Sequence, residues 1–200
     1  MKKVNFIALL LMALPVFVAC TSDDDTEPMV EEELEIVLVE DLHAAGAHSG
    51  GTDTIYYSLE NNAIVPNKEG DWDLGFFGTS IFTSGGVYGS GSAQAAVIEE
   101  TVFEELKEIP TSLVLAVDTK EGLAIPTGMG NGWYNYDMTS HFITPIAGRV
   151  IVVKTNAGNY AKMDILSFFK GNPTTSEMAL ENMYYFTFRY VLQPNGTKTF

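Results

Sequence analysis

The sequence has little of what a disulfide-stabilised or nucleic-acid-binding protein needs. Its 200 residues include a single cysteine, Cys20, so no disulfide can form within the chain and the fold must depend on its core. Only 11 basic residues are present against 26 acidic ones, and the formal net charge is −15. A chain of this charge is not expected to bind nucleic acid or anionic lipid.

Motifs of the common catalytic sites are also missing. The chain has no G-x-S-x-G and no H-E-x-x-H, and its glycine-rich segment 84–92 lacks the Lys-Ser/Thr ending of a phosphate-binding loop. His43 and His48 have no carboxylate or cysteine at metal-binding spacing, whereas a catalytic zinc requires three protein ligands. We therefore expect a protein that is not an enzyme.

The first 33 residues indicate export. Lys2 and Lys3 precede an apolar run that ends at Ala19-Cys20, which is too short for a membrane-spanning helix and predicts a signal peptide over residues 1–19. A cysteine at this junction is similar to the lipobox of bacterial lipoproteins and predicts lipidation of Cys20. The alternative is a simple signal peptide with Cys20 as a free thiol.

An acidic tether is predicted over residues 20–33. Its run of aspartates at 23–25 is typical of a solvated linker. The run also looks like the signal that sends lipoproteins of Bacteroidota to the outer face of the outer membrane. The expected location is therefore the outer membrane, lipid-anchored and exposed at the cell surface, or released from it.

The rest of the chain, residues 34–200, has the pattern of an all-β domain. Glycine and aromatic residues are abundant, and long helical periodicity is scarce. Short β-rich runs predict strands at residues 34–39, 54–59, 71–77, 149–155, 160–169 and 184–193, the last being the final ten residues of the closing segment 178–193. The turn at 156–159 predicts a hairpin. Residues 93–108 are compatible with a short helix or an irregular strand.

Five motifs occur in order along this domain. They are D-W-D-L-x-F at 71–76, N-G-W-Y-N-Y at 131–136, P-I-A-G-R-V at 145–150, Y-A-K-M-D-I-L-S-F-F-K-G at 160–171 and F-T-F-R-Y at 186–190. Together with the leader, they make residues 34–193 resemble the HmuY family, haem-binding lipoproteins of Bacteroidota. The resemblance implies a single sandwich-like antiparallel domain with long projecting loops that bind haem. It also implies a haemophore, which takes haem from host carriers and passes it to a TonB-dependent outer-membrane receptor.

The resemblance also suggests residues for the haem site. Met138 stands where the best-known member has a histidine iron ligand. The family's other ligand lies on a hairpin that is shortened here between residues 113 and 132, and Met129 is the only residue of that segment with a sulfur or an imidazole. A thioether is an established axial ligand of haem iron. His141 is a rival ligand. The candidates for a porphyrin pocket are the aromatic residues that follow Met129: Trp133, Tyr134, Tyr136 and Phe142.

Each of these residues also has a structural interpretation. Met138 can pack under the aromatic loop that opens at residue 131 with the N-G-W-Y-N-Y motif, and the aromatic residues can be pinned against the sheet. The alternative function is a surface interaction lipoprotein that binds protein or glycan through the aromatic loop, without haem.

Overall fold

The strands pair into three antiparallel sheets in a computed structural model, which describes residues 33–47 and 50–200. The predicted signal peptide, Cys20, most of the acidic tether and His48 lie outside the described residues. Residues 33–200 form one compact unit. Within the described residues, no helix is long and apolar enough to cross a membrane.

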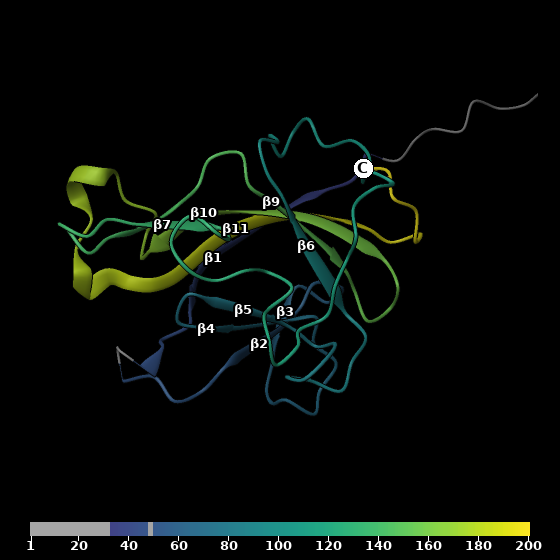
Figure 1. The fold of residues 1–200 in the computed structure, drawn as a ribbon, viewed down its shortest axis with the longest axis horizontal. Coiled ribbons are helices and arrows are strands. Elements are labelled where there is room, and N and C mark those ends of the chain that lie inside the picture. Colours follow the sequence, from purple (N-terminus) through teal and green to yellow (C-terminus); the bar gives the residue numbers. More distant parts are fainter. Residues whose placement is uncertain (1–32, 48–49) are drawn as a thin grey trace, which may run out of the picture. The chain divides into compact units, whose positions relative to one another are not determined.

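One layer of this unit is a five-stranded sheet with the order β1-β11-β10-β9-β6 (Figure 1). Its strands are β1 (Ile36–His43), β6 (Gln94–Ile98), β9 (Val150–Lys154), β10 (Tyr160–Phe169) and β11 (Met183–Gln193). The predicted hairpin is confirmed, because β9 and β10 pair in antiparallel fashion. Gly158 supplies the left-handed residue of its turn, with φ of +90°.

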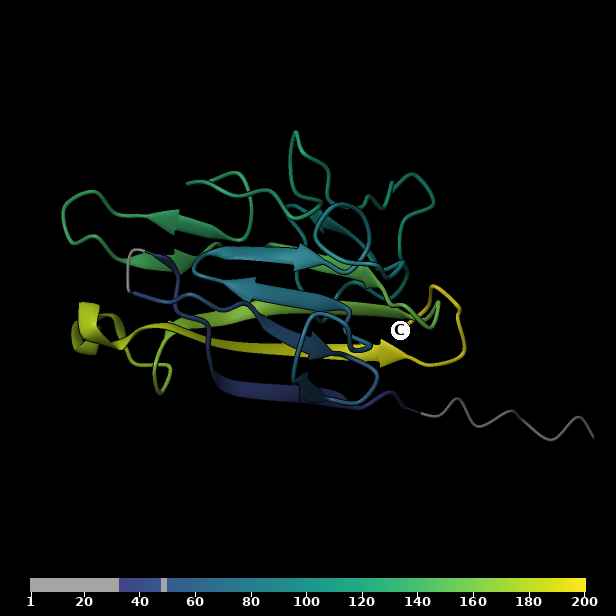
Figure 2. The ribbon, with the colours of Figure 1, turned by 90° about the horizontal axis from the view of Figure 1, so that it is seen from below.

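The second layer is a four-stranded sheet with the order β3-β2-β4-β5. Its strands are β2 (Ile55–Ser58), β3 (Ala63–Val65), β4 (Leu74–Phe77) and β5 (Ser80–Thr83). A two-stranded ribbon of β7 (Tyr134–Tyr136) and β8 (Ile143–Pro145) projects at one end (Figure 2). Two short 3-10 helices, η2 (Thr175–Glu177) and η3 (Leu180–Asn182), lie at the same end, and the described residues contain no α-helix.

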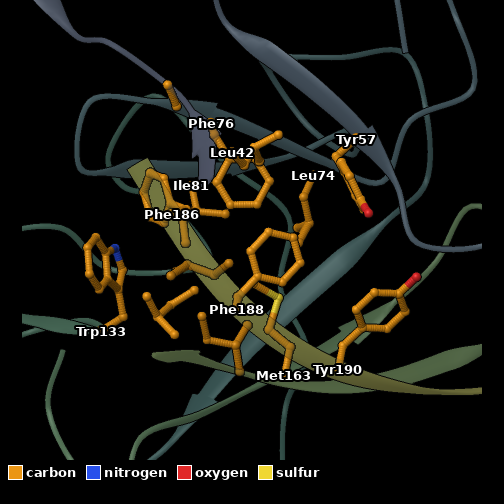
Figure 3. Packing of buried hydrophobic residues seen from close by; sticks show 14 of the residues in the cluster. Leu42, Tyr57, Leu74, Phe76, Ile81, Trp133, Met163, Phe186, Phe188 and Tyr190 are labelled. Atoms are coloured by element: carbon orange, nitrogen blue, oxygen red, sulfur yellow. The ribbon is translucent and has the colours of Figure 1, made fainter. Parts of the chain in front are cut away.

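Aromatic side chains fill the space between the two layers (Figure 3). Phe76 of β4 packs against Phe186 and Phe188 of β11, with ring centroids 5.1 and 5.6 Å apart. Tyr57 of β2 meets the edge of Phe188 at 5.6 Å. The all-β, sandwich-like prediction is therefore confirmed, and its two inner faces supply the core that the chain needs in the absence of disulfides.

Three predicted stretches can be compared with the observed strands. For residues 93–108 the strand alternative is confirmed over 94–98, since β6 pairs with β9, and a turn follows at residues 103–105. The terminal strand is confirmed, because β11 begins at Met183, directly after η3 and one residue before the predicted start. The strand β1 continues to His43, which pairs with Tyr185 of β11.

Asn156, in the β9–β10 turn, joins three segments at the end of the sandwich opposite the ribbon. Its Oδ1 accepts hydrogen bonds from the hydroxyl of Ser84 (2.7 Å) and from the backbone N–H groups of Ser92 (2.8 Å) and Ala93 (3.0 Å). Its Nδ2 donates to Oδ1 of Asp71 (3.0 Å) and to the carbonyl oxygen of Trp72 (2.7 Å). The D-W-D motif is thus part of the scaffold.

Candidate functional site

A pocket of about 500 Å³ opens among the loops at the ribbon end of the sandwich. Its walls come from segments far apart in the sequence: the β1–β2 loop, the β4–β5 turn, the loop before β7, both ribbon strands and the start of β11. The lining residues are Gly46, Ala47, Phe77, Gly78, Thr79, Ser80, Met129, Tyr134, Tyr136, Ile143 and Tyr184. None of these side chains carries a charge. The pocket therefore suits a largely apolar ligand with a flat, aromatic surface.

Close backbone contact forms one wall of the pocket. A Cβ atom on Gly46 would lie 2.8 Å from the Cα of Gly78, and Gly78 has φ of +57°. Any side chain at either position would therefore separate the β1–β2 loop from the β4–β5 turn. The N–H of Gly78 also donates to the carbonyl oxygen of Ala44 at 3.0 Å.

The loop at residues 128–131 presents Met129 at the rim of the pocket. Gly128 and Gly130, on either side of Met129, have φ of +97° and +78°. The N–H of Gly130 donates to the carbonyl oxygen of Tyr134 (3.0 Å), and Nη2 of Arg149 donates to the carbonyl oxygen of Gly130 (3.1 Å). Met129 is 56% exposed. The thioether is thus solvent-accessible on a loop that several hydrogen bonds hold in place.

The turn between β7 and β8 carries Met138 and His141. Asp137 organises this turn, because its Oδ1 accepts hydrogen bonds from the N–H groups of Thr139 (2.7 Å) and Ser140 (3.0 Å). Both bonds stabilise the carboxylate, the one from Ser140 more than the one from Thr139. They hold the pKa of the Asp137 carboxyl below its ordinary value. Met138 is 76% exposed and does not line the pocket.

His141 lies beside a pocket residue although it is not part of the lining. It has φ of +62°, and its N–H donates to the carbonyl oxygen of Asp137 at 2.8 Å. A hydrogen bond joins its Nδ1 to the hydroxyl of Tyr136. The turn therefore places an imidazole against one of the phenols of the pocket.

The four predicted pocket aromatics occupy different environments. Tyr134 and Tyr136 line the pocket, whereas Trp133 is 2% exposed and belongs to the core. Nε1 of Trp133 donates to the carbonyl oxygen of Thr79 at 3.0 Å, so the indole supports a pocket wall from behind. Phe142 packs edge-on against Phe169, with ring centroids 5.4 Å apart. Neither Trp133 nor Phe142 is a lining residue.

Sequence reasoning did not identify the lining residues outside the ribbon and its preceding loop. Phe77 and Thr79 come from a tight turn between core strands, and Tyr184 comes from the start of β11. Tyr184 has φ of +74°, which is unusual for an aromatic residue and is typical of functional or strained sites. The glycine-rich character of segment 41–53, which contains Gly46, was the available signal for close backbone contact.

The histidines and carboxylates give no indication of a structural metal centre. Among the described residues, no group of three histidine, cysteine, aspartate or glutamate side chains is arranged to hold a metal ion. The ring of His43 stacks on Tyr185 with centroids 4.4 Å apart. The donors at the pocket are therefore a thioether, three phenols and the imidazole behind Tyr136.

Comparisons with known proteins agree with this architecture. A search of curated proteins found no match. Among solved structures, the chain is similar to the apo HmuY analog of Tannerella forsythia, with a TM-score of 0.50, 16% identity, and coverage of 80% of this chain and 98% of that one. At this identity the likeness shows the fold alone.

Two further structures from Bacteroides have lower scores. One is a proposed lipoprotein of Bacteroides fragilis (TM-score 0.48, 16% identity, 78% of this chain and 89% of that chain covered). The other is a proposed HmuY-like heme-binding protein of Bacteroides vulgatus (TM-score 0.45, 13% identity, 78% and 90% covered). The sequence model described as HmuY protein matches residues 51–190, well over half of the chain. The chain belongs to the HmuY family.

Proposed function

We propose that this protein binds haem noncovalently in the pocket at the ribbon end of the sandwich. The observation that carries the proposal is the pocket itself: about 500 Å³, uncharged, and lined by aromatic rings, in a chain of the HmuY family. Small-molecule sites are typically apolar clefts of about 300–1,000 Å³ with a few placed polar groups. The donors at this pocket also fit haem iron, since thioether, phenolate and imidazole all serve as axial ligands.

Met129 is the predicted axial ligand that the pocket favours. Its side chain lines the pocket, whereas Met138 is directed to solvent from the tip of the ribbon. Met138 and His141 remain candidates if the ribbon turn folds over a bound porphyrin. A thioether ligand would favour ferrous over ferric iron.

We further propose that the protein is a lipid-anchored surface haemophore. The cysteine at the end of the apolar leader supports a lipid anchor, and the acidic residues after it support exposure at the cell surface. An exposed pocket rim supports exchange of haem with host carriers and with a TonB-dependent outer-membrane receptor. In this scheme the protein binds and transfers its ligand without catalysis.

The alternative function, binding of protein or glycan through the aromatic loop, has less support because two aromatic side chains of that loop are buried. Trp133 is 2% exposed and Tyr134 is 8% exposed. Trp133 is therefore not available to a partner in this conformation, and Tyr134 is available only from within the pocket. Haem binding is the function that the arrangement supports better.

A haem titration of the chain produced without residues 1–20 tests the proposal. We expect a Soret band that saturates at about one equivalent. Met129→Ala should weaken binding more than Met138→Ala, because only the former residue lines the pocket. If no saturable band forms with either ferric or ferrous haem, haem binding is refuted, and the protein- or glycan-binding function becomes the leading hypothesis.

A further inference from the structure

Three phenols line the pocket, and their hydroxyl groups have different surroundings. The phenolic oxygen of Tyr134 accepts hydrogen bonds from the N–H of Gly128 (3.1 Å) and from the hydroxyl of Thr79 (3.3 Å). These two bonds connect the loop before β7 to the β4–β5 turn. The hydroxyl of Tyr136 is bonded instead to Nδ1 of His141. Tyr136 is therefore the pocket phenol whose hydroxyl pairs with an imidazole nitrogen, a group able to accept its proton.

The geometry of the ribbon turn maintains this pair. His141 takes up a left-handed conformation, with φ of +62°, directly after a turn fixed by the carboxylate of Asp137. This conformation is uncommon outside glycine and turns the imidazole back over the ribbon, where its ring centroid lies 5.9 Å from that of Tyr136. The same turn leaves Met138 directed to solvent.

On the premise that the pocket binds haem, we propose that Tyr136 supplies an oxygen ligand to the iron and that His141 receives the phenolic proton. On ligation, the O–H bond of Tyr136 breaks, the oxygen keeps the electron pair, and the proton passes to Nδ1 of His141. The proton thus stays on the ribbon as an imidazolium in the turn that also contains the Asp137 carboxylate. No oxidant or reductant is required. His141 is then a positioning residue and not itself a ligand.

The proposed ligand changes which oxidation state the site prefers. A phenolate is a hard, anionic donor and stabilises ferric iron, whereas a thioether is a soft, neutral donor and stabilises ferrous iron. Ligation by Tyr136 therefore predicts tighter binding of ferric than of ferrous haem. Ligation by methionines alone predicts the reverse order.

The test uses ferric haem added to the chain without residues 1–20 and compares Tyr136→Phe with Tyr184→Phe. Both variants remove one hydroxyl from a phenol of the same pocket, so Tyr184→Phe is the matched control. We expect a phenolate-to-iron charge-transfer band and the corresponding resonance Raman signals in the wild type. Tyr136→Phe should lose both signals, and Tyr184→Phe should keep them. Circular dichroism and thermal melting check that each variant is folded.

Variants of His141 separate positioning from ligation. His141→Ala should keep the charge-transfer band but weaken ferric haem binding by roughly 10- to 100-fold, the usual effect of removing an outer-shell partner. His141→Gln retains a hydrogen-bond acceptor and should recover part of that loss. If His141→Ala instead abolishes the axial-ligand signature and Tyr136→Phe does not, His141 is the ligand and the inference is wrong.

The remaining outcomes distinguish the inference from the function on which it rests. Saturable haem binding with a spectrum that Tyr136→Phe leaves unchanged would refute the inference while haem binding stands. Loss of the band in Tyr184→Phe alone would assign the oxygen ligand to Tyr184 and would also refute it. Absence of saturable binding in both oxidation states of the wild type would refute the haem function and the inference together.

Discussion

Replacement of Trp133 by alanine tests whether this indole is a core residue or a part of the ligand site. Its side chain is 2% exposed, and its ring centroid lies 4.9–5.5 Å from those of Tyr134, Phe168 and Phe186. Removing a buried tryptophan costs about 3–5 kcal/mol, and loss of its hydrogen bond to the Thr79 carbonyl adds about 1 kcal/mol. Since domains of this size are stable by about 5–15 kcal/mol, Trp133→Ala should leave the protein marginally folded.

Urea denaturation followed by far-ultraviolet circular dichroism measures this loss without relying on tryptophan fluorescence. Trp133→Phe should cost about 1–3 kcal/mol, because it keeps most of the apolar volume and leaves the Thr79 carbonyl without its partner. Met138→Ala is the exposed control and should stay within about 0.5 kcal/mol of the wild type. If Trp133→Ala is as stable as the wild type and loses haem binding, the indole is a ligand-site residue and our interpretation is wrong.

Three further predictions follow from other parts of the molecule. Asn156→Ala removes three part-buried hydrogen bonds at about 1 kcal/mol each, so urea unfolding should show a free energy of unfolding lower by about 3 kcal/mol. Asn195→Ala removes only an exposed hydrogen bond and should leave the free energy of unfolding almost unchanged. Burial raises the pKa of Tyr57 to about 12, against about 10 in an unfolded chain. The neutral folded phenol therefore gives stability that is intact below about pH 10 and falls by about 2–3 kcal/mol towards pH 12, and Tyr57→Phe should lessen this fall in melting experiments. Haem affinity should change by less than about threefold between low salt and roughly 0.5 M salt, because the pocket lining is uncharged, and a steep salt dependence in the titration would contradict this.

Local sequence patterns predicted the strands that pair with close neighbours. The strand over residues 160–169 has the predicted bounds, because its apolar pattern and the glycine turn before it both act locally. The extension of β1 to His43 was not predictable in this way, since it depends on pairing with Tyr185, far away in the sequence. For residues 93–108 the sequence left a short helix and an irregular strand open, and long-range pairing with β9 decides for a strand over 94–98.

The candidate site was predictable only where it lies on a single stretch of chain. Met129, Tyr134 and Tyr136 line the pocket, and all three were named from the segment around the N-G-W-Y-N-Y motif. The two-residue period of a strand places Tyr134 and Tyr136 on one face and Trp133 on the other, which is the signal that separates them. The wall formed by the β4–β5 turn and Tyr184 depends on tertiary packing and left no local pattern.

The proposed iron donors would allow one pocket both to hold haem and to release it. Met129 comes from the loop before β7 and Tyr136 from β7 itself, on a sandwich whose core lies beneath them. A thioether and a phenolate prefer opposite oxidation states of iron, so the two donors would bind ferric and ferrous haem with different strengths. Because the lining offers no charged partner, a porphyrin would be held by ring contacts and by the iron ligands rather than by ion pairs. Affinity at this site would therefore depend chiefly on the iron and its ligands, so a change in ligation or oxidation state would be the most direct route for the proposed haem transfer.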